Sequence, residues 1–293
     1  MTNNKLQKIA VIGTGIMGMP VASNLAKSGH KIFIYARRPK SIKKKLHRNM
    51  ALCNNKEQLF KSSNILILNV SNTDDVEEIL IGKDGLYKYE KHPKLVIDMS
   101  TICPIKTKQI SQKLKKKNIY MFDCPVSGGE TGAINRKLSI MVGGEFKNYY
   151  KISNILNKIA KKLTYIGETG SGQLTKICNQ IVVAQTIHAI GEAFILADAF
   201  KVNKNKVREA LLGGFANSKI LENHGQRMIN KQYKAGFTTK LHLKDLKIAK
   251  DISKNKKLKL QALEKTLKIM KKNNKSNANK DSSSYYLTLK KET

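Results

Sequence analysis

The sequence predicts an α/β protein in which a doubly wound, mostly parallel sheet precedes an all-helical domain. Three observations support this prediction: apolar runs alternate with helix-compatible segments up to Gly167, the alternation is lost afterwards, and one long apolar-rich segment occupies residues 173–200. Such alternation is typical of parallel sheets with right-handed crossovers. We therefore expect two domains joined by one long helix.

Short apolar runs mark the expected strands of the sheet. The run at residues 8–12 stops at Gly13, as a buried parallel strand does, and Gly29 closes the helix-compatible segment that follows. A second strand is expected at residues 31–35, directly after that glycine. Further strands are expected at residues 65–70, 95–99, 119–123, 138–142 and 163–166.

The part of the chain after Gly167 has no convincing strand pattern. Amphipathic stretches near residues 204–213, 217–231 and 243–270 predict helices. The end of the chain is rich in Lys, Asn and Ser, a composition that favours a partial tail. The expected domains are residues 1–168 for the sheet, 169–270 for the helices and 271–293 for the C-terminal segment.

The chain is strongly basic, with 55 Lys+Arg against 21 Asp+Glu and a formal net charge of +34. A charge of this size could serve binding to nucleic acids, whose phosphates attract cations. Only six of the basic residues are Arg, the better partner for phosphates and bases, and the lysines are spread along the whole chain. We therefore expect a solvated lysine surface and no specific nucleic-acid partner, although the field would steer a small anionic substrate.

Two apolar segments imitate membrane or export signals. Residues 9–22 follow two lysines as a secretory signal would, but they contain a glycine-rich turn that such a signal does not need. The best candidate for a membrane span, residues 181–200, is interrupted by Gln185, His188, Glu192 and Asp198. We expect a cytoplasmic protein with no membrane partner.

The cysteines show no spacing typical of metal ligands, so we expect free thiols in a reducing compartment and no metal site. They are Cys53, Cys103, Cys124 and Cys178.

A glycine motif of the form G-x-G-x-x-G lies between the first expected strand and the helix that follows it. In this context the first glycine makes a tight turn, the second lets the backbone approach a pyrophosphate, and the third lets helix and strand pack closely. The free N–H groups of the helix would face the anion. The motif predicts a Rossmann-type dinucleotide site made by Gly13, Thr14, Gly15, Ile16, Met17 and Gly18.

The end of the second strand indicates which dinucleotide is bound. NAD-specific sites usually place a carboxylate there for the ribose hydroxyls, but no Asp or Glu occurs between Lys31 and Lys56. Arg37 and Arg38 stand there instead. Two guanidinium groups suit a 2′-phosphate, so we expect NADPH, with NADH possible.

Two further clusters follow expected strands. Residues 98–104 (DMSTICP) and residues 123–129 (DCPVSGG) both come where ligands bind, at the carboxyl edge of a parallel sheet. In the second cluster Ser127 precedes Gly128 and Gly129, and backbone N–H groups exposed in this way suit a substrate carboxylate.

A third cluster, residues 170–180 (GSGQLTKICNQ), opens the long helix. Lys176, Asn179 and Gln180 are spaced i, i+3 and i+4, which places them on one face of the helix.

These motifs together resemble the β-hydroxyacid dehydrogenase family, which includes 3-hydroxyisobutyrate dehydrogenase and tartronate semialdehyde reductase. The resemblance covers residues 8–250 and rests on GTGIMGMPVASNLAKSGH, DMSTICP, DCPVSGGETGA, LSIMVGG, GSGQLTKICNQ and LHLKDL in that order. TKICNQIVVA and residues 213–229 look particularly like the tartronate semialdehyde reductases. At Asp281 the match to the family's acidic C-terminal signature is loose.

The resemblance implies a role for each site residue. Lys176 would donate a proton to the alkoxide that forms as hydride arrives. Ser127, Gly128 and Gly129 would hold the substrate carboxylate, with Asn179 and Gln180 positioning the substrate. The cofactor would also be contacted by Thr101, Phe237 and Lys244.

The implied activity is the NADPH-dependent reduction of 2-hydroxy-3-oxopropanoate to D-glycerate by a homodimer or homotetramer. Two alternatives remain open: another short 3-hydroxy acid dehydrogenase, acting for example on 3-hydroxyisobutyrate, and a non-catalytic nucleic-acid-binding protein on a reductase fold. Intact clusters at Lys176 and at residues 127–129 argue against the second.

Overall fold

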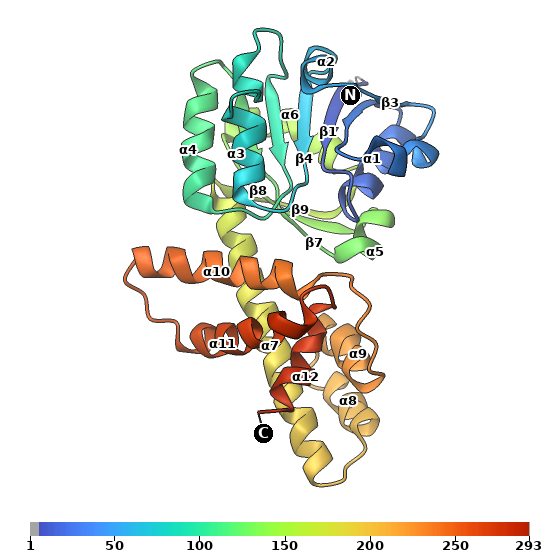
Figure 1. Cartoon of the computed structure of the whole chain (residues 1–293), viewed down its shortest axis with the longest axis vertical. Helices are drawn as coiled ribbons and strands as arrows, with labels where there is room; N and C mark the ends of the chain where they lie inside the picture. Colours follow the sequence, from blue (N-terminus) through green and yellow to red (C-terminus); the bar gives the residue numbers. More distant parts are fainter. Residues whose placement is uncertain (1–5, 293) are drawn as a thin grey trace. The chain divides into compact units, whose positions relative to one another are not determined.

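The computed structural model describes residues 6–292 and divides the chain into two compact units, Met1–Lys176 and Ile177–Thr293. A nine-stranded sheet with helices on its faces makes up most of the described part of the first unit (Figure 1). The described part of the second unit is helical apart from one isolated bridge between Thr238 and Asp281. The predicted fold class is confirmed.

The sheet has the strand order β3-β2-β1-β4-β5-β6-β8-β7, with β9 paired to β8. Strands β3 to β6 along this path are parallel, whereas β8 runs antiparallel to β6 and to β7, and β9 runs parallel to β8. The strands are β1 (Lys8–Ile12), β2 (Lys31–Tyr35), β3 (Met50–Leu52), β4 (Ile65–Leu68), β5 (Leu95–Asp98), β6 (Tyr120–Asp123), β7 (Val126–Ser127), β8 (Leu138–Gly143) and β9 (Ala160–Gly167).

Helices cover both faces of the sheet because its strands are apolar on both sides. In β1, Ile9 and Val11 pack into one core while Ala10 and Ile12 pack into another, as the two-residue period of a strand requires. One core contains residues of α1 (Gly18–Lys27), α5 (Gly129–Ile134) and α6 (Tyr150–Leu156), and the other those of α2 (Lys56–Lys61), α3 (Thr73–Ile81) and α4 (Pro104–Lys115). Figure 1 shows α3 and α4 side by side on one face.

The apolar runs located the seven longer strands to within three residues. Gly29 also closes α1 as expected, with φ +96° and its N–H donated to the carbonyl oxygen of Ala26 at 3.0 Å. Strands β3 and β7 were not predicted. Both are two or three residues long, and their hydrogen bonds to neighbouring strands hold them in place without an apolar run of their own.

The helical unit is built around the continuation of α7, which begins at Ser171 in the first unit and ends at Ala199. Ile177, Ala184, Ile187 and Phe194 of α7 are buried in the core of this unit. The other helices are α8 (Lys204–Leu212), a π-helical turn at Leu221–Gly225, α9 (Gln226–Ile229), α10 (Thr239–Asn255), α11 (Gln261–Asn277) and α12 (Tyr285–Leu289).

Two expectations for this half of the chain are wrong. The stretch 243–270 is not one helix, because the chain turns between α10 and α11, where Lys257 has a left-handed φ of +56°. The end of the chain is not a tail within residues 271–292. Instead α11 continues to Asn277, and Tyr285, Tyr286 and Leu289 of α12 are buried in the helical core. Lys271, Lys272 and Lys275 lie on the exposed face of amphipathic α11, whereas Asn273 is buried.

Helix α7 is the one helix within residues 6–292 that is long and apolar enough to cross a membrane by composition alone. A core helix of a globular protein meets the same two criteria, and α7 contributes the buried side chains named above.

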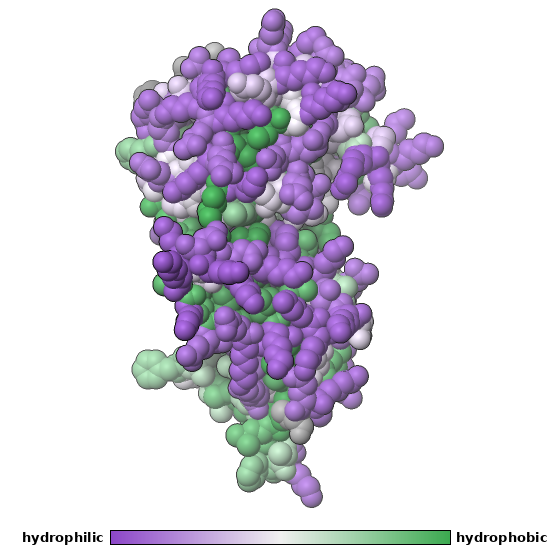
Figure 2. All heavy atoms as spheres, turned by 60° about the vertical axis from the view of Figure 1, so that its left-hand side comes forward, coloured by the Kyte–Doolittle hydropathy of each residue, from purple (hydrophilic) through white to green (hydrophobic). Residues whose placement is uncertain are grey.

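Hydrophilic side chains cover most of the face seen in Figure 2, with apolar residues in smaller areas between them. This distribution agrees with lysines spread over the whole sequence.

Candidate active site

The carboxyl ends of the parallel strands form one row across the sheet. Strand pairing places Tyr35 beside Ile12, Ile12 beside Leu68, Leu68 beside Asp98, and Asp98 beside Asp123. The segments that leave this row therefore begin at one edge of the sheet, where ligands of such folds bind. They carry the glycine turn, the arginine pair, Thr101 and, after β6, Ser127.

At two of the three glycines in the glycine turn, an added Cβ would clash with the protein backbone. Gly13 has φ +96°, and a Cβ there would lie 2.1 Å from the backbone oxygen of Asn69. A Cβ on Gly18 would lie 1.8 Å from the backbone oxygen of Gly13. A Cβ on Gly15 would meet nothing within 4 Å. The protein leaves the space beside Gly15 open, as a turn that admits a pyrophosphate must.

The turn also fits a dinucleotide in its polar groups. The side-chain nitrogen of Asn69 is buried and has no hydrogen-bond partner among the described residues, so it is a donor beside the glycine turn that a ligand could use. Thr14, Ile16 and Met17 lie in the same turn, before α1 begins. A nicotinamide dinucleotide would be held there by this backbone.

Arg37 and Arg38 follow β2 by two and three residues, and both side chains are exposed. Neither guanidinium has an ion pair or hydrogen bond to another residue within 6–292. They are available at the edge of the sheet where the ribose of a dinucleotide would lie.

The ends of β4 and β5 are tied together by side chains. The hydroxyl of Ser100 accepts a hydrogen bond from the backbone N–H of Val70 at 2.9 Å, and the Asp98 carboxylate accepts one from the N–H of Ser100 at 3.0 Å. Thr101 follows directly and is half-buried. The hydrogen bonds between these two strand ends thus hold the backbone that leads into Thr101.

The start of α7 is anchored on a buried carboxylate. Asp123 is fully buried at the end of β6, and its two oxygens accept hydrogen bonds from the N–H groups of Gly170 and Gln173, each at 2.8 Å. Burial raises the pKa of Asp123, and these backbone hydrogen bonds counteract part of the increase. A Cβ on Gly172 would lie 2.5 Å from the backbone oxygen of Met141, so the chain approaches the sheet closely here.

Gln173 extends this anchor to β5. Its amide oxygen accepts a hydrogen bond from the N–H of Ile102 at 3.0 Å, and its amide nitrogen donates to the backbone oxygen of Ser100 at 2.8 Å. Lys176 lies one helical turn beyond Gln173 and is itself only 8% exposed. Asp123 and Gln173 belong to two of the predicted clusters, but no role was predicted for either residue. For Asp123, a charged residue at the end of an apolar run was the available signal.

Ser127 lies in β7, and the two glycines after it adopt left-handed backbone conformations, with φ +127° at Gly128 and +60° at Gly129. A Cβ on Gly129 would meet nothing within 4 Å. Both glycines are exposed, so their backbone is open to a ligand.

In the helical unit, Asn179 and Gln180 are linked to α10. The amide nitrogen of Asn179 donates to the side-chain oxygen of Gln180 at 2.9 Å, and the amide nitrogen of Gln180 donates to Asp245 at 2.7 Å. Asp245 is also ion-paired with Lys244 at 3.1 Å. Phe237 lies just before α10, and its ring is 5.4 Å from that of His242. The structure therefore brings together all four predicted residues of this unit through α10.

Within residues 6–292 no group of three or more His, Cys, Asp or Glu could hold a metal ion. The four cysteines are free in the structure.

The fold and the glycine turn define a dinucleotide-binding protein of the Rossmann type. A family model described as the NAD binding domain of 6-phosphogluconate dehydrogenase matches residues 8–167. A second, described as the NAD-binding of NADP-dependent 3-hydroxyisobutyrate dehydrogenase, matches residues 170–289.

Two relatives by sequence and one solved structure are similar to this chain over most of its length. The 2-hydroxy-3-oxopropionate reductase of Escherichia coli (strain K12) is 39% identical over 242 residues, which cover 83% of this chain and 82% of the relative. The 2-(hydroxymethyl)glutarate dehydrogenase of Eubacterium barkeri is 28% identical over 248 residues, covering 84% and 82%. A Mycobacterium tuberculosis 3-hydroxyisobutyrate dehydrogenase, solved with L-serine, has a TM-score of 0.87 at 26% identity and covers 97% of this chain and 99% of that one.

This chain belongs to the β-hydroxyacid dehydrogenase family, as its motifs predicted. It is an NAD(P)-dependent oxidoreductase that acts on CH–OH groups of small molecules.

Proposed function

We propose that this protein reduces tartronate semialdehyde (2-hydroxy-3-oxopropanoate) to D-glycerate with NADPH. The observation that carries the proposal is the 39% identity to the E. coli 2-hydroxy-3-oxopropionate reductase over 83% of this chain. Gln180, in place of the Asn found in many family members, favours the same branch.

NADPH is the proposed reductant because of the end of β2. The side chains of Arg37 and Arg38 are exposed there, without a carboxylate to bind ribose hydroxyls. Two guanidinium groups would bind a 2′-phosphate with charge-assisted hydrogen bonds, whereas NADH offers them no such partner.

Bound NADPH would supply hydride to the aldehyde carbon of the substrate. The ammonium of Lys176 would stabilise the negative charge that develops on the aldehyde oxygen and then transfer a proton from Nζ to it, which completes the hydroxyl group. Its burial supports this role, because a charge stabilises a neighbouring charge better where water is excluded. Asp123 and Gln173 would hold this part of α7 in place.

The other predicted site residues would bind and orient the substrate and the cofactor. Ser127 and the open backbone of Gly128 and Gly129 would hold the substrate carboxylate, and Asn179 would contact the substrate. The Gln180 side chain is hydrogen-bonded to Asn179 and Asp245, so its proposed role is to orient the side chain of Asn179. Thr101, Phe237 and Lys244 would contact the cofactor, together with the turn from Gly13 to Gly18.

We further propose that residues 1–168 bind the cofactor and that residues 169–270 supply substrate contacts and the dimer surface. In this proposal the protein works in the cytoplasm as a homodimer or homotetramer.

The test is NADPH oxidation by the purified protein with a panel of short oxo acids. We expect tartronate semialdehyde to have the highest kcat/KM. The fold similarity to the M. tuberculosis 3-hydroxyisobutyrate dehydrogenase makes the aldehyde of 3-hydroxyisobutyrate the main comparator, and succinate semialdehyde is the third. A higher kcat/KM with either comparator would refute the proposed substrate.

A further inference from the structure

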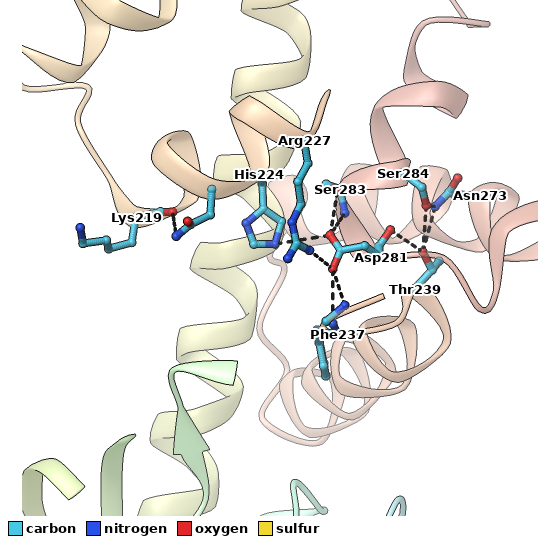
Figure 3. Close-up of polar contacts among 11 residues, drawn as sticks. Lys219, His224, Arg227, Phe237, Thr239, Asn273, Asp281, Ser283 and Ser284 are labelled. Atoms are coloured by element: carbon cyan, nitrogen blue, oxygen red, sulfur yellow. Dashed lines mark hydrogen bonds and ion pairs between the residues drawn. The ribbon is translucent and has the colours of Figure 1, made fainter. Parts of the chain in front are cut away.

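A buried carboxylate from the C-terminal segment holds the loop that carries Phe237. Asp281 is 1% exposed, and its Oδ2 accepts hydrogen bonds from the backbone N–H groups of Gly236 at 3.2 Å and Phe237 at 3.3 Å. The guanidinium of Arg227 is ion-paired with the same oxygen. In Figure 3 the dashed lines from these groups converge on the Asp281 carboxylate.

The other oxygen of Asp281 is held by its own segment. Oδ1 accepts hydrogen bonds from the hydroxyl of Ser283 at 2.7 Å and from its backbone N–H at 3.1 Å, with His224 Nε2 at 3.8 Å (Figure 3). Both oxygens of Asp281 thus accept hydrogen bonds. An Asn at this position has only one side-chain oxygen, so its NH2 group would face the donors that now meet the other oxygen. The loop requires a carboxylate at this position.

Backbone hydrogen bonds join the same two segments. The N–H of Asp281 donates to the carbonyl oxygen of Tyr233 at 3.0 Å, and the N–H of Ser282 donates to that of Phe237 at 2.9 Å. The N–H of Thr239 donates in return to the carbonyl oxygen of Lys280 at 2.9 Å. The loop before α10 is therefore fixed along its length by residues 280–282.

This loop leads directly into the helix that carries Lys244. Thr238 caps α10, and its hydroxyl accepts a hydrogen bond from the N–H of Leu241 at 3.3 Å. Beyond the cap, His242 contacts the backbone oxygen of Gln180 at 3.2 Å, and Asp245 accepts the hydrogen bond from the Gln180 amide. The position of the loop therefore affects the positions of Phe237, of Lys244 and of the Gln180 amide next to Asn179.

We infer that Asp281, together with Arg227, is a positioning residue for the reaction, which acts by fixing the loop of Phe237 and the start of α10. This inference rests on the proposed function for the roles of Phe237, Lys244 and Asn179. Asp281 itself contacts neither substrate nor cofactor in this account.

The order of the loop can be measured directly because the chain contains no tryptophan. Phe237→Trp places a single fluorescent reporter on the loop, and acrylamide quenching reports its exposure. In this background Asp281→Asn should increase the quenching constant at least about twofold, since the N–H groups of residues 236 and 237 lose their charged acceptor. Ser283→Ala removes one donor only and should give a smaller increase, which covers the case in which Asp281→Asn does not fold.

Activity is measured in the natural Phe237 background. Asp281→Asn should lower kcat/KM for the oxo acid by about tenfold to a hundredfold, as small displacements of positioned groups do. The Kd for NADPH should change less than kcat/KM, because the glycine turn and the arginine pair belong to the other unit. Asp251→Asn, a change of the same kind at an exposed residue of α10, is the matched control and should leave both quantities unaltered.

The outcomes separate the two proposals. A folded Asp281→Asn protein with wild-type quenching and wild-type kcat/KM would overturn the positioning role. If the wild-type protein oxidises NADPH with none of the oxo acids, the proposed function fails, and the quenching comparison still decides whether Asp281 orders the loop.

Discussion

The Asp123 carboxylate accepts a hydrogen bond of 2.8 Å from the backbone N–H of Gln173, one helical turn before Lys176. The helix that carries the proposed proton donor is thereby held on the end of a central strand. A negative charge at a helix N-terminus also interacts favourably with the helix dipole. The proposed proton donor thus follows a helix start that is anchored on the sheet.

Asp123→Asn should weaken this anchor. The new amide nitrogen would face a backbone N–H and leave one buried donor unpaired, at a cost of about 1–3 kcal/mol in the free energy of unfolding. We expect a lower Tm and a kcat reduced by about tenfold or more. Glu90→Gln, the same change at an exposed residue of this unit, is the control for the thermal unfolding and rate measurements. An unchanged kcat would show that Lys176 does not depend on the anchor.

The glycines at positions 15 and 18 should respond differently to alanine. Gly15→Ala adds a Cβ into open space, so Tm should stay the same or rise slightly, whereas cofactor binding should weaken because the backbone can no longer approach the pyrophosphate. Gly18→Ala places a Cβ against the backbone oxygen of Gly13 and should lower Tm. Thermal unfolding and NADPH titration measure both effects. Full affinity in Gly15→Ala would place the pyrophosphate elsewhere.

The double variant Arg37→Ala/Arg38→Ala should lose preference for NADPH. Loss of one charge-assisted hydrogen bond, about 1.5–3 kcal/mol, corresponds to roughly a tenfold to hundredfold rise in the KM for NADPH. The KM for NADH should change little. Arg48→Ala, an exposed arginine of the same unit, serves as the control. Equal effects on both cofactors would contradict the assignment of the 2′-phosphate.

Lys176→Ala should remove the proton donor. We expect kcat to fall by about 10²–10⁴-fold, the usual contribution of a general acid. NADPH titration should give a Kd close to that of the wild type. Lys161→Ala, at an exposed residue of β9, controls for the loss of one positive charge. Turnover that survives the Lys176 change would mean that the proton comes from another group.

Asp198 makes the helical unit sensitive to acid. Hydrogen bonds from Lys204 and Lys290 lower the pKa of its carboxyl from 3.8 to about 2. Because the pKa is lower in the folded state, the stabilisation is complete above about pH 4 and is lost as the pH falls towards 2. Asp198→Asn should therefore lower Tm at pH 7 but not at pH 2. Thermal unfolding of both proteins between these pH values provides the check, and a Tm difference independent of pH would refute the role of the charge.

Local patterns were sufficient for the fold and for part of the site. The apolar runs, the glycine turn and the helix start at Gly170 are each encoded by neighbouring residues, and the structure has a strand, a turn and a helix at those places. The C-terminal segment was misjudged because its polar composition conceals a buried cluster. Ser282, Ser283 and Ser284 are fully buried, and the hydroxyl of Ser284 lies 3.2 Å from that of Thr239, which is distant in the sequence.

The sequence by itself determined the order of the seven longer strands, the dinucleotide motif and the family, because these depend on periodicity and on short motifs. Only the tertiary structure decided that Asp123 anchors α7, that Gln180 faces Asp245 and that Asp281 holds the loop of Phe237. Each of these contacts joins residues more than 40 positions apart. A hydrogen bond over such a separation depends on how the backbone packs, and neighbouring residues carry no signal of it.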